Sequence, residues 1–199
     1  MPALHEIRAD FDRDTLVVYQ AYPAAIAEPA VAAGRFVPPF SMHRMTWIKP
    51  SFTWMMARSN WASRRGQEHV LAVRIRRDGW ESALREAVLT SYHPGVHPDA
   101  AAWSSSFSVA PIHVQWDPER SLRGAKLEHR SIQVGISRHR IESFVNEWAV
   151  GLEDITARVH KMRDFLGCGR IDRARQLQPP ERPYPVPHDI ASRLAISEP

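Results

Sequence analysis

The chain of 199 residues is long enough for one sizeable domain, and its 44% hydrophobic and 24% charged residues are ordinary for a globular protein. Cys168 is the single cysteine, which excludes an intrachain disulfide and a cysteine-based zinc site. The N-terminus lacks the apolar core of a signal peptide, and no apolar run reaches the length of a membrane span. We therefore expect a soluble, cytoplasmic protein with no membrane partner.

The net charge of +4 is carried mainly by arginine, since Lys49, Lys126 and Lys161 are the only lysines. Guanidinium groups make two-pronged contacts with phosphates and carboxylates, so the composition suggests an anionic small molecule as partner. A GC-rich genome would produce the same bias, and the composition alone does not separate the two explanations.

Segments rich in β-branched and aromatic residues predict five strands. In chain order they are TLVVYQ (15–20), MHRMTWI (42–48), HVLAVRIR (69–76), PIHVQW (111–116) and SIQVGI (131–136). The third and the fifth alternate with period two, which is typical of a strand with one buried face.

Four helices are expected between and after these strands. In chain order they cover residues 24–36, 51–62, 79–92 and 138–166. In the first of these segments, which contains Pro29, the helix is expected to end at Gly34, a residue type that tolerates the left-handed conformation of a helix C-terminus. The last carries apolar residues at steps of three and four, with a potential interruption at Gly151, and predicts a long amphipathic helix.

The remaining segments predict a loop and a tail. Residues 91–110 are rich in Pro, Ser and Ala and are expected to form a long loop. Residues 179–199 are expected to form a Pro-rich tail after a single domain over residues 1–178, with 179–187 extended on the surface. Short strands mixed with helices, without strict βαβ alternation, predict an α+β fold with a mostly antiparallel sheet flanked by helices.

The segment 44–61 (RMTWIKPSFTWMMARSNW) is unusually aromatic and cationic. On a helix, Trp54, Arg58 and Trp61 share one face. The opposite, apolar face holds Phe52, Met55 and Met56. A guanidinium between two indoles can stack on them and still direct its N–H groups at an anion. The alternative is a buried helix whose arginine pairs with an internal carboxylate.

The segment QWDPER (115–120) places Asp117 and Glu119 two residues apart. On a strand both side chains would face one side, whereas Pro118 favours a turn with the carboxylates in solvent. Such a pair can bind ribose hydroxyls, accept protons or hold Mg²⁺. The two carboxylates alone do not define a metal site, and the ten histidines have no ligand spacing, so we predict no metal.

The start of the predicted long helix is cationic. Ser137 is a suitable N-cap, yet Arg138, His139 and Arg140 occupy the first turn, where positive charge opposes the helix dipole. An anion bound at the free N–H groups would offset this cost, and side chains extended into solvent are the alternative. The chain has no glycine-rich phosphate loop, nucleophile elbow or HExxH motif, so hydrolase chemistry is not favoured.

On its sequence blocks the chain is identified as a member of the domain-of-unknown-function 4291 family. The blocks are IRADFDRDTLVVYQAY (7–22), RMTWIKPSFTWMMARSNWA (44–62), QWDPER (115–120) and RSIQVGI (130–136). The resemblance extends over nearly the whole chain, and it implies no established activity.

The order of the motifs is also similar to that of ADP-ribosyltransferase folds, which include RNA 2′-phosphotransferases. Residues 18–36 resemble their first strand, helix and glycine, residues 46–59 the wall of the nicotinamide pocket, and residues 130–145 the third active-site strand. This resemblance implies a split sheet and NAD or RNA as ligand. Gln20 stands where the usual histidine binds ribose. Arg130 replaces the usual catalytic glutamate, as in the phosphotransferase branch.

Two functions follow as hypotheses. The first is an ADP-ribosyltransferase-like enzyme that acts on NAD or on an ADP-ribosyl or phosphorylated RNA end. Its catalytic candidates are Glu119, Arg130 and Gln20. Its candidates for binding substrate or cofactor are Arg44, Trp47, Lys49, Trp54, Arg58, Tyr22, Asp117 and Gln133. The second is a non-catalytic protein that binds nucleotides or single-stranded RNA through the same arginine and aromatic groups.

Overall fold

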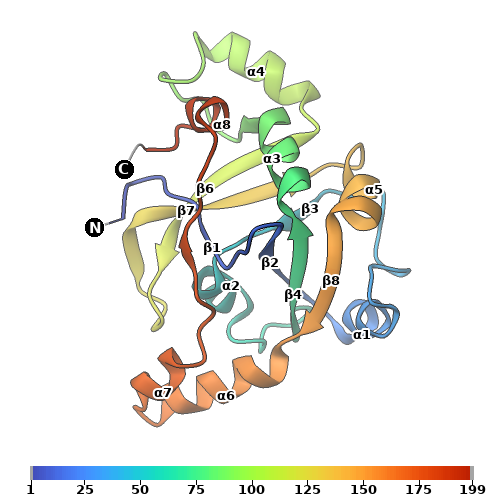
Figure 1. Cartoon of the computed structure of the whole chain (residues 1–199), viewed down its shortest axis with the longest axis vertical. Helices are drawn as coiled ribbons and strands as arrows, with labels where there is room; N and C mark the ends of the chain where they lie inside the picture. The colour runs from blue at the N-terminus through green and yellow to red at the C-terminus, as the bar shows by residue number, and fades with distance from the viewer. Residues whose placement is uncertain (1, 198–199) are drawn as a thin grey trace.

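The computed structural model describes residues 2–197 and contains two main β-sheets flanked by helices (Figure 1). One has the strand order β2-β4-β8, formed by β2 (Thr15–Tyr22), β4 (His69–Arg76) and β8 (Ala149–Asp154). The other has the order β3-β7-β6-β5, formed by β3 (Thr46–Ile48), β7 (Lys126–Ile136), β6 (Ile112–Arg120) and β5 (Ala87–Leu89). All neighbouring strands in these sheets are antiparallel except β5 and β6. The predicted α+β fold with mostly antiparallel strands is confirmed.

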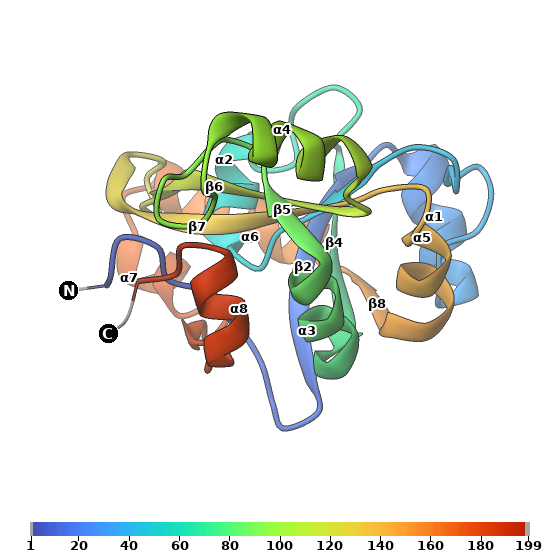
Figure 2. The same cartoon turned by 90° about the horizontal axis from the view of Figure 1, so that it is seen from above.

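The helices flank these sheets on several sides (Figures 1 and 2). In chain order they are α1 (Ala24–Ala33), α2 (Phe52–Ser59), α3 (Arg77–Glu86), α4 (Ala100–Val109), α5 (Ile141–Ser143), the π-helical turn η1 (Phe144–Trp148), α6 (Thr156–Gly167), α7 (Ile171–Arg175) and α8 (His188–Arg193). A short pairing of β1 (Arg8–Ala9) with β9 (Arg182–Pro183) brings the two ends of the chain together. None of the helices in residues 2–197 is both long and apolar enough to cross a membrane.

Strand β2 is buried on both faces. Leu16 and Val18 belong to the main core, which includes residues of α1, α3 and the four-stranded sheet. Val17 and Tyr19 belong to a second apolar cluster formed with α2 and α6. Because successive side chains of a strand point to opposite faces, the nearly continuous apolar run of β2 predicts this arrangement.

The predicted strand 69–76 matches β4, while the prediction for 42–48 overstates β3. Strand β6 extends through Pro118, so the turn predicted there is wrong. Proline is tolerated at this point because β5 pairs only with Ile112–Val114, and this part of β6 has no neighbour on that side. Both carboxylates of QWDPER therefore lie on a strand.

The long helix predicted over 138–166 is wrong. The chain forms α5 and η1, then the strand β8, and only then α6. The apolar residues that step by three and four are buried or packed on the core, but they reach it from different elements. Strand β8 completes the three-stranded sheet by pairing with β4, and this long-range pairing overrides the local helical pattern.

Two further boundaries differ from the predictions. The helix predicted over 79–92 ends at Glu86, and the chain then enters β5. The loop predicted over 91–110 contains α4, which begins where the Asp99 side chain accepts a hydrogen bond from the Ala102 N–H at 2.7 Å. Helix α4 has no buried residue, which explains why no apolar stripe signals it.

The Pro-rich C-terminal segment is attached to the domain by buried side chains. Tyr184, Ile190 and Leu194 belong to the main core. The Glu181 carboxylate accepts a hydrogen bond from the Phe52 N–H at 2.7 Å, at the start of α2. Burial raises the pKa of Glu181 to about 8, and the nearby Glu119 carboxylate adds to this effect. Residues 179–187 thus run along the domain as a strap that contacts α2.

We predict that Glu181→Gln stabilises the protein at alkaline pH. Because the folded-state pKa is raised from 4.5 to about 8, the folded protein retains a proton that the unfolded chain has released, and the wild type loses stability as the pH rises through this window. The glutamine keeps a carbonyl acceptor for the Phe52 N–H. Urea unfolding should show a gain of about 1–3 kcal/mol at pH 8.5 and little change at pH 5. The same pH dependence in both proteins would contradict this account.

Candidate functional site

A cavity of about 440 Å³ opens beside β2 and β3, close to the point where the two sheets meet. The sheets meet where the Tyr19 N–H of β2 donates a hydrogen bond of 2.7 Å to the Lys49 carbonyl, just after β3. Side chains from β2, β3, α2, β7 and two loops line the cavity. It contains eight of the residues that the sequence singles out, namely Gln20, Tyr22, Arg44, Trp47, Lys49, Trp54, Arg58 and Gln133.

Neutral polar groups form one wall of the cavity. The Gln20 side chain is only 2% exposed, and its Nε2 donates to Tyr22 Oη at 2.9 Å, to Thr46 Oγ1 at 2.8 Å and to the Trp47 carbonyl at 3.1 Å. Its Oε1 is buried and accepts no hydrogen bond from residues 2–197. Burial raises the pKa of Tyr22 to about 12, so this hydroxyl stays protonated at neutral pH. The wall therefore offers hydrogen bonds without a negative charge.

Two half-buried indoles contribute aromatic surface. A glycine in β7 lets the Trp47 ring lie directly against the strand, because a Cβ at Gly135 would come within 2.8 Å of Trp47 Cη2 and Cζ3. Trp54 lies on α2, and its ring faces the Lys49 ammonium. Both rings line the cavity, so both can stack against a planar group of a ligand.

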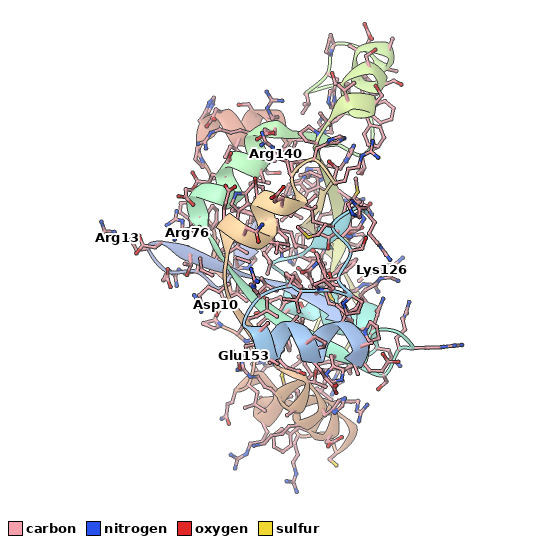
Figure 3. All side chains as sticks on the ribbon, turned by 90° about the vertical axis from the view of Figure 1, so that its right-hand side faces the viewer. Asp10, Arg13, Arg76, Lys126, Arg140 and Glu153 are labelled. Carbon is pink, nitrogen blue, oxygen red and sulfur yellow. The ribbon has the colours of Figure 1, made fainter. Side chains whose placement is uncertain are left out.

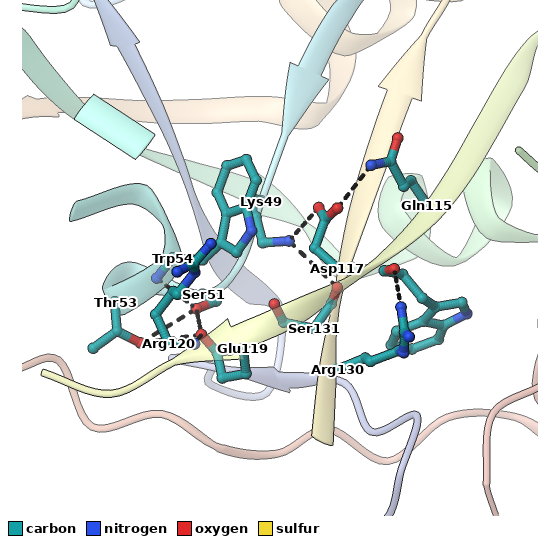
Figure 4. Close-up of polar contacts among 11 residues, drawn as sticks. Lys49, Ser51, Thr53, Trp54, Gln115, Asp117, Glu119, Arg120, Arg130 and Ser131 are labelled. Carbon is teal, nitrogen blue, oxygen red and sulfur yellow. Dashed lines mark hydrogen bonds and ion pairs between the residues drawn. The ribbon is translucent and has the colours of Figure 1, made fainter. Parts of the chain in front are cut away.

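Lys49 connects the cavity to the interior of the four-stranded sheet. Its side chain is 1% exposed, and Nζ donates to Asp117 Oδ2 at 3.0 Å and to the Ser131 carbonyl at 3.3 Å (Figure 4). Nζ also lies 4.0 Å from the centroid of the Trp54 ring. Burial lowers the pKa of Lys49 from 10.5 to about 8, although the Asp117 charge opposes this shift. The buried cation on this indole is thus the lysine, and not Arg58 as the helical spacing predicts.

Arg44 and Arg58 are exposed side chains that line the cavity. Within residues 2–197 neither guanidinium forms an ion pair with a carboxylate. The alternative in which Arg58 pairs with an internal carboxylate is therefore wrong. The predicted core face of α2 is confirmed, with Phe52, Met55 and Met56 buried. Trp61 lies beyond the end of α2, at a positive φ of 55°, and so does not share a helical face with Arg58.

The two carboxylates of QWDPER point to one side of β6, as the strand alternative predicts, but neither lines the cavity. Asp117 pairs with Lys49. Glu119 is 7% exposed, and its Oε1 accepts hydrogen bonds from Ser51 Oγ at 2.8 Å, Thr53 Oγ1 at 3.3 Å and the Arg120 N–H at 2.6 Å. Both carboxylates are held by internal contacts behind the cavity wall.

Arg130 lies apart from the cavity. Alternation along β7 directs Ser131 and Gln133 toward the cavity side and Arg130 toward the other face. There its guanidinium donates to the Trp116 carbonyl at 3.1 Å (Figure 4). Of the candidates named from the sequence, Arg44 and Arg58 therefore line the cavity, whereas the catalytic candidates Glu119 and Arg130 do not.

Several cavity residues have no counterpart among the sequence-based candidates. They come mainly from the loops, and include Phe40, Ser41, Met45, Gly66 and Gln67. Loops lack the periodicity that orients side chains in helices and strands, so no pattern in the sequence assigns them to the site. Within residues 2–197, no group of three or more His, Cys, Asp or Glu side chains is arranged to hold a metal ion.

Comparison with known proteins identifies a family. A search of curated proteins finds no match. A family model described as "Domain of unknown function (DUF4291)" matches residues 6–184, a range that contains every residue lining the cavity. The chain therefore belongs to the domain-of-unknown-function 4291 family.

Proposed function

We propose that the cavity binds a nucleotide, or the phosphorylated end of a larger nucleotide-containing molecule such as NAD or RNA. This proposal rests on two guanidinium groups and two half-buried indoles in one cavity, where neither guanidinium pairs with a carboxylate of residues 2–197. A volume of about 440 Å³ falls within the range of small-molecule sites. A guanidinium group can form charge-assisted hydrogen bonds with the phosphates, and an indole can stack on a base or a nicotinamide ring.

The charge distribution supports an anionic ligand. No Asp or Glu lines the cavity within the described part of the chain, because Asp117 and Glu119 are held behind its wall. Within the described residues, no carboxylate therefore offsets the guanidinium groups of Arg44 and Arg58, whereas the Lys49 ammonium is paired with Asp117. Neutral Gln20 and the other amides remain to bind hydroxyl or amide groups of a ribose or base.

Group transfer on NAD, or on an ADP-ribosyl or phosphorylated RNA end, is the second candidate function, and one observation favours it. A lysine with a pKa of about 8 can exchange protons near neutral pH, and Lys49 lines the cavity. Glu119 is engaged in hydrogen bonds at the start of α2. In this candidate, Lys49 therefore replaces Glu119 as the acid–base group that accepts a proton from the attacking hydroxyl.

We predict that Arg44→Ala and Arg58→Ala each weaken the binding of ADP or NAD by about 10- to 100-fold, which corresponds to the loss of a charge-assisted hydrogen bond. Isothermal titration calorimetry measures these affinities. Arg173→Ala is the matched control, since this exposed arginine on α7 does not line the cavity. An equal loss in the control, or no binding of any phosphorylated nucleoside to the wild type, would overturn the proposal.

A second prediction concerns the indole packed on β7. In Gly135→Ala the new methyl group displaces the Trp47 ring, because its Cβ would lie 2.8 Å from two ring atoms. We expect nucleotide affinity to fall by about 10-fold, a loss comparable to that of one aromatic contact. Gly151→Ala in β8 is the control, since its Cβ would meet Arg74 Cβ at an ordinary 3.5 Å. The same affinity in both variants would show that Trp47 makes no ligand contact.

A third prediction tests the transfer reaction. If Lys49 is the proton acceptor, the release of nicotinamide from NAD should increase as the pH rises through about 8, because the neutral amine forms in that range. Lys49→Met should abolish this increase, and Glu119→Gln should retain it. Chromatography of released nicotinamide provides the rate. Absence of turnover on NAD and on phosphorylated RNA, with binding intact, would eliminate the transfer reaction and leave the binding function.

A further inference from the structure

A second hollow, of about 320 Å³, adjoins the cavity. It is lined by His43, Met45, Ser108, Val109, Ala110, Ser137, Arg138 and His139. Met45 lines both hollows, so they lie next to each other on the surface. No Asp or Glu lines this second hollow in the part of the chain that the structure describes.

The pairing of β3 with β7 brings the basic residues of this hollow, His43, Arg138 and His139, together. The two strands are antiparallel, and Thr46 lies opposite Ile136. The residues just before β3 (43–45) therefore lie beside the residues just after β7 (137–139). The Ser137 N–H donates to the Pro111 carbonyl at 3.0 Å, which fixes this corner to the start of β6. We call these two segments the basic strip.

The basic side chains of the strip are available to an external ligand. His43, Arg138 and His139 are exposed, and none of them forms an ion pair with a carboxylate of residues 2–197. The neighbouring Arg140 behaves differently. Its guanidinium pairs with both Glu86 oxygens at 2.7–2.8 Å, and Figure 3 shows it beside α3. Arg140 thus pairs with a carboxylate, whereas within the described chain Arg138 pairs with none and its Nε donates only to His139 Nε2, at 3.4 Å.

We propose that the basic strip is the path of a single-stranded polynucleotide whose phosphorylated end occupies the cavity. This inference rests on the proposed nucleotide-binding function and specifies the class of ligand. A mononucleotide that fills the cavity leaves Arg138 and His139 without a role, whereas the next phosphates of a strand would lie along them. Contacts of this kind neutralise phosphates without reading the sequence.

The geometry also selects a single strand over a duplex. A volume of about 440 Å³ admits one nucleotide, and a base in a duplex is stacked and paired, so a terminal nucleotide must be unpaired before it can enter. Trp47 and Trp54 then replace the lost stacking of that base. Both features favour an unpaired end.

The experiment compares phosphorylated oligoribonucleotides of one, four and eight nucleotides by competition fluorescence anisotropy, at several salt concentrations. We expect affinity to rise by about 10-fold or more from one to four nucleotides, with a steeper salt dependence for the longer ligands. The double variant Arg138→Ala/His139→Ala should remove this gain and leave the affinity for the mononucleotide unchanged. Arg173→Ala/His188→Ala removes the same two residue types from exposed positions outside both hollows and serves as the control.

The outcomes separate this inference from the function on which it rests. Equal affinity for one and four nucleotides would contradict the proposed polynucleotide path along the basic strip, but it would leave the proposed nucleotide site unaffected. A duplex with a blunt end that binds as tightly as the single strand would also contradict the proposed path. If neither the mononucleotide nor the oligonucleotides bind, both the proposed nucleotide-binding function and the proposed polynucleotide path are contradicted.

Discussion

The position of Lys49 is the constraint on which the rest of the structure depends. Its carbonyl accepts the hydrogen bond from Tyr19 that joins the two sheets, and its ammonium binds Asp117 and the Ser131 carbonyl inside the four-stranded sheet. A buried ammonium is costly unless a charge and further acceptors surround it, and this site provides both. The residues on either side of Lys49 then build the cavity, with β3 before it and α2 after it.

The same arrangement explains why the cavity is cationic. The chain has 22 acidic residues, yet none of those in the described part of the chain lines the cavity. Asp117 compensates Lys49, whereas Glu119 and Glu181 bind groups at the start of α2. The helix N-terminus, often an anion site, is thus occupied by the protein's own acidic side chains. An external anion is left with the exposed arginines beside the indoles, which is why the proposed site lies there.

The sequence predicts those features that depend on the composition and spacing of neighbouring residues. The concentration of tryptophan, methionine and cations in residues 44–61 correctly marks a wall of the cavity, and the period-two pattern of 69–76 correctly predicts β4. Long-range pairing determines the rest. The apolar residues of 138–166 show the same spacing whether they belong to one helix or to the four elements that the chain forms there. Helical spacing likewise pairs Arg58 with Trp54, whereas the fold brings Lys49 there from outside the helix.

The central claim is that the arginines of this cavity recognise phosphate and its aromatic wall recognises a base. Titration calorimetry of the wild-type protein with ADP and with adenosine tests it most directly, because the two ligands share a base and ribose and differ in the phosphates. The account predicts that ADP binds at least about 10-fold more tightly than adenosine, with the difference falling as salt is added. Equal affinities for the two ligands, or no binding of either, would contradict it.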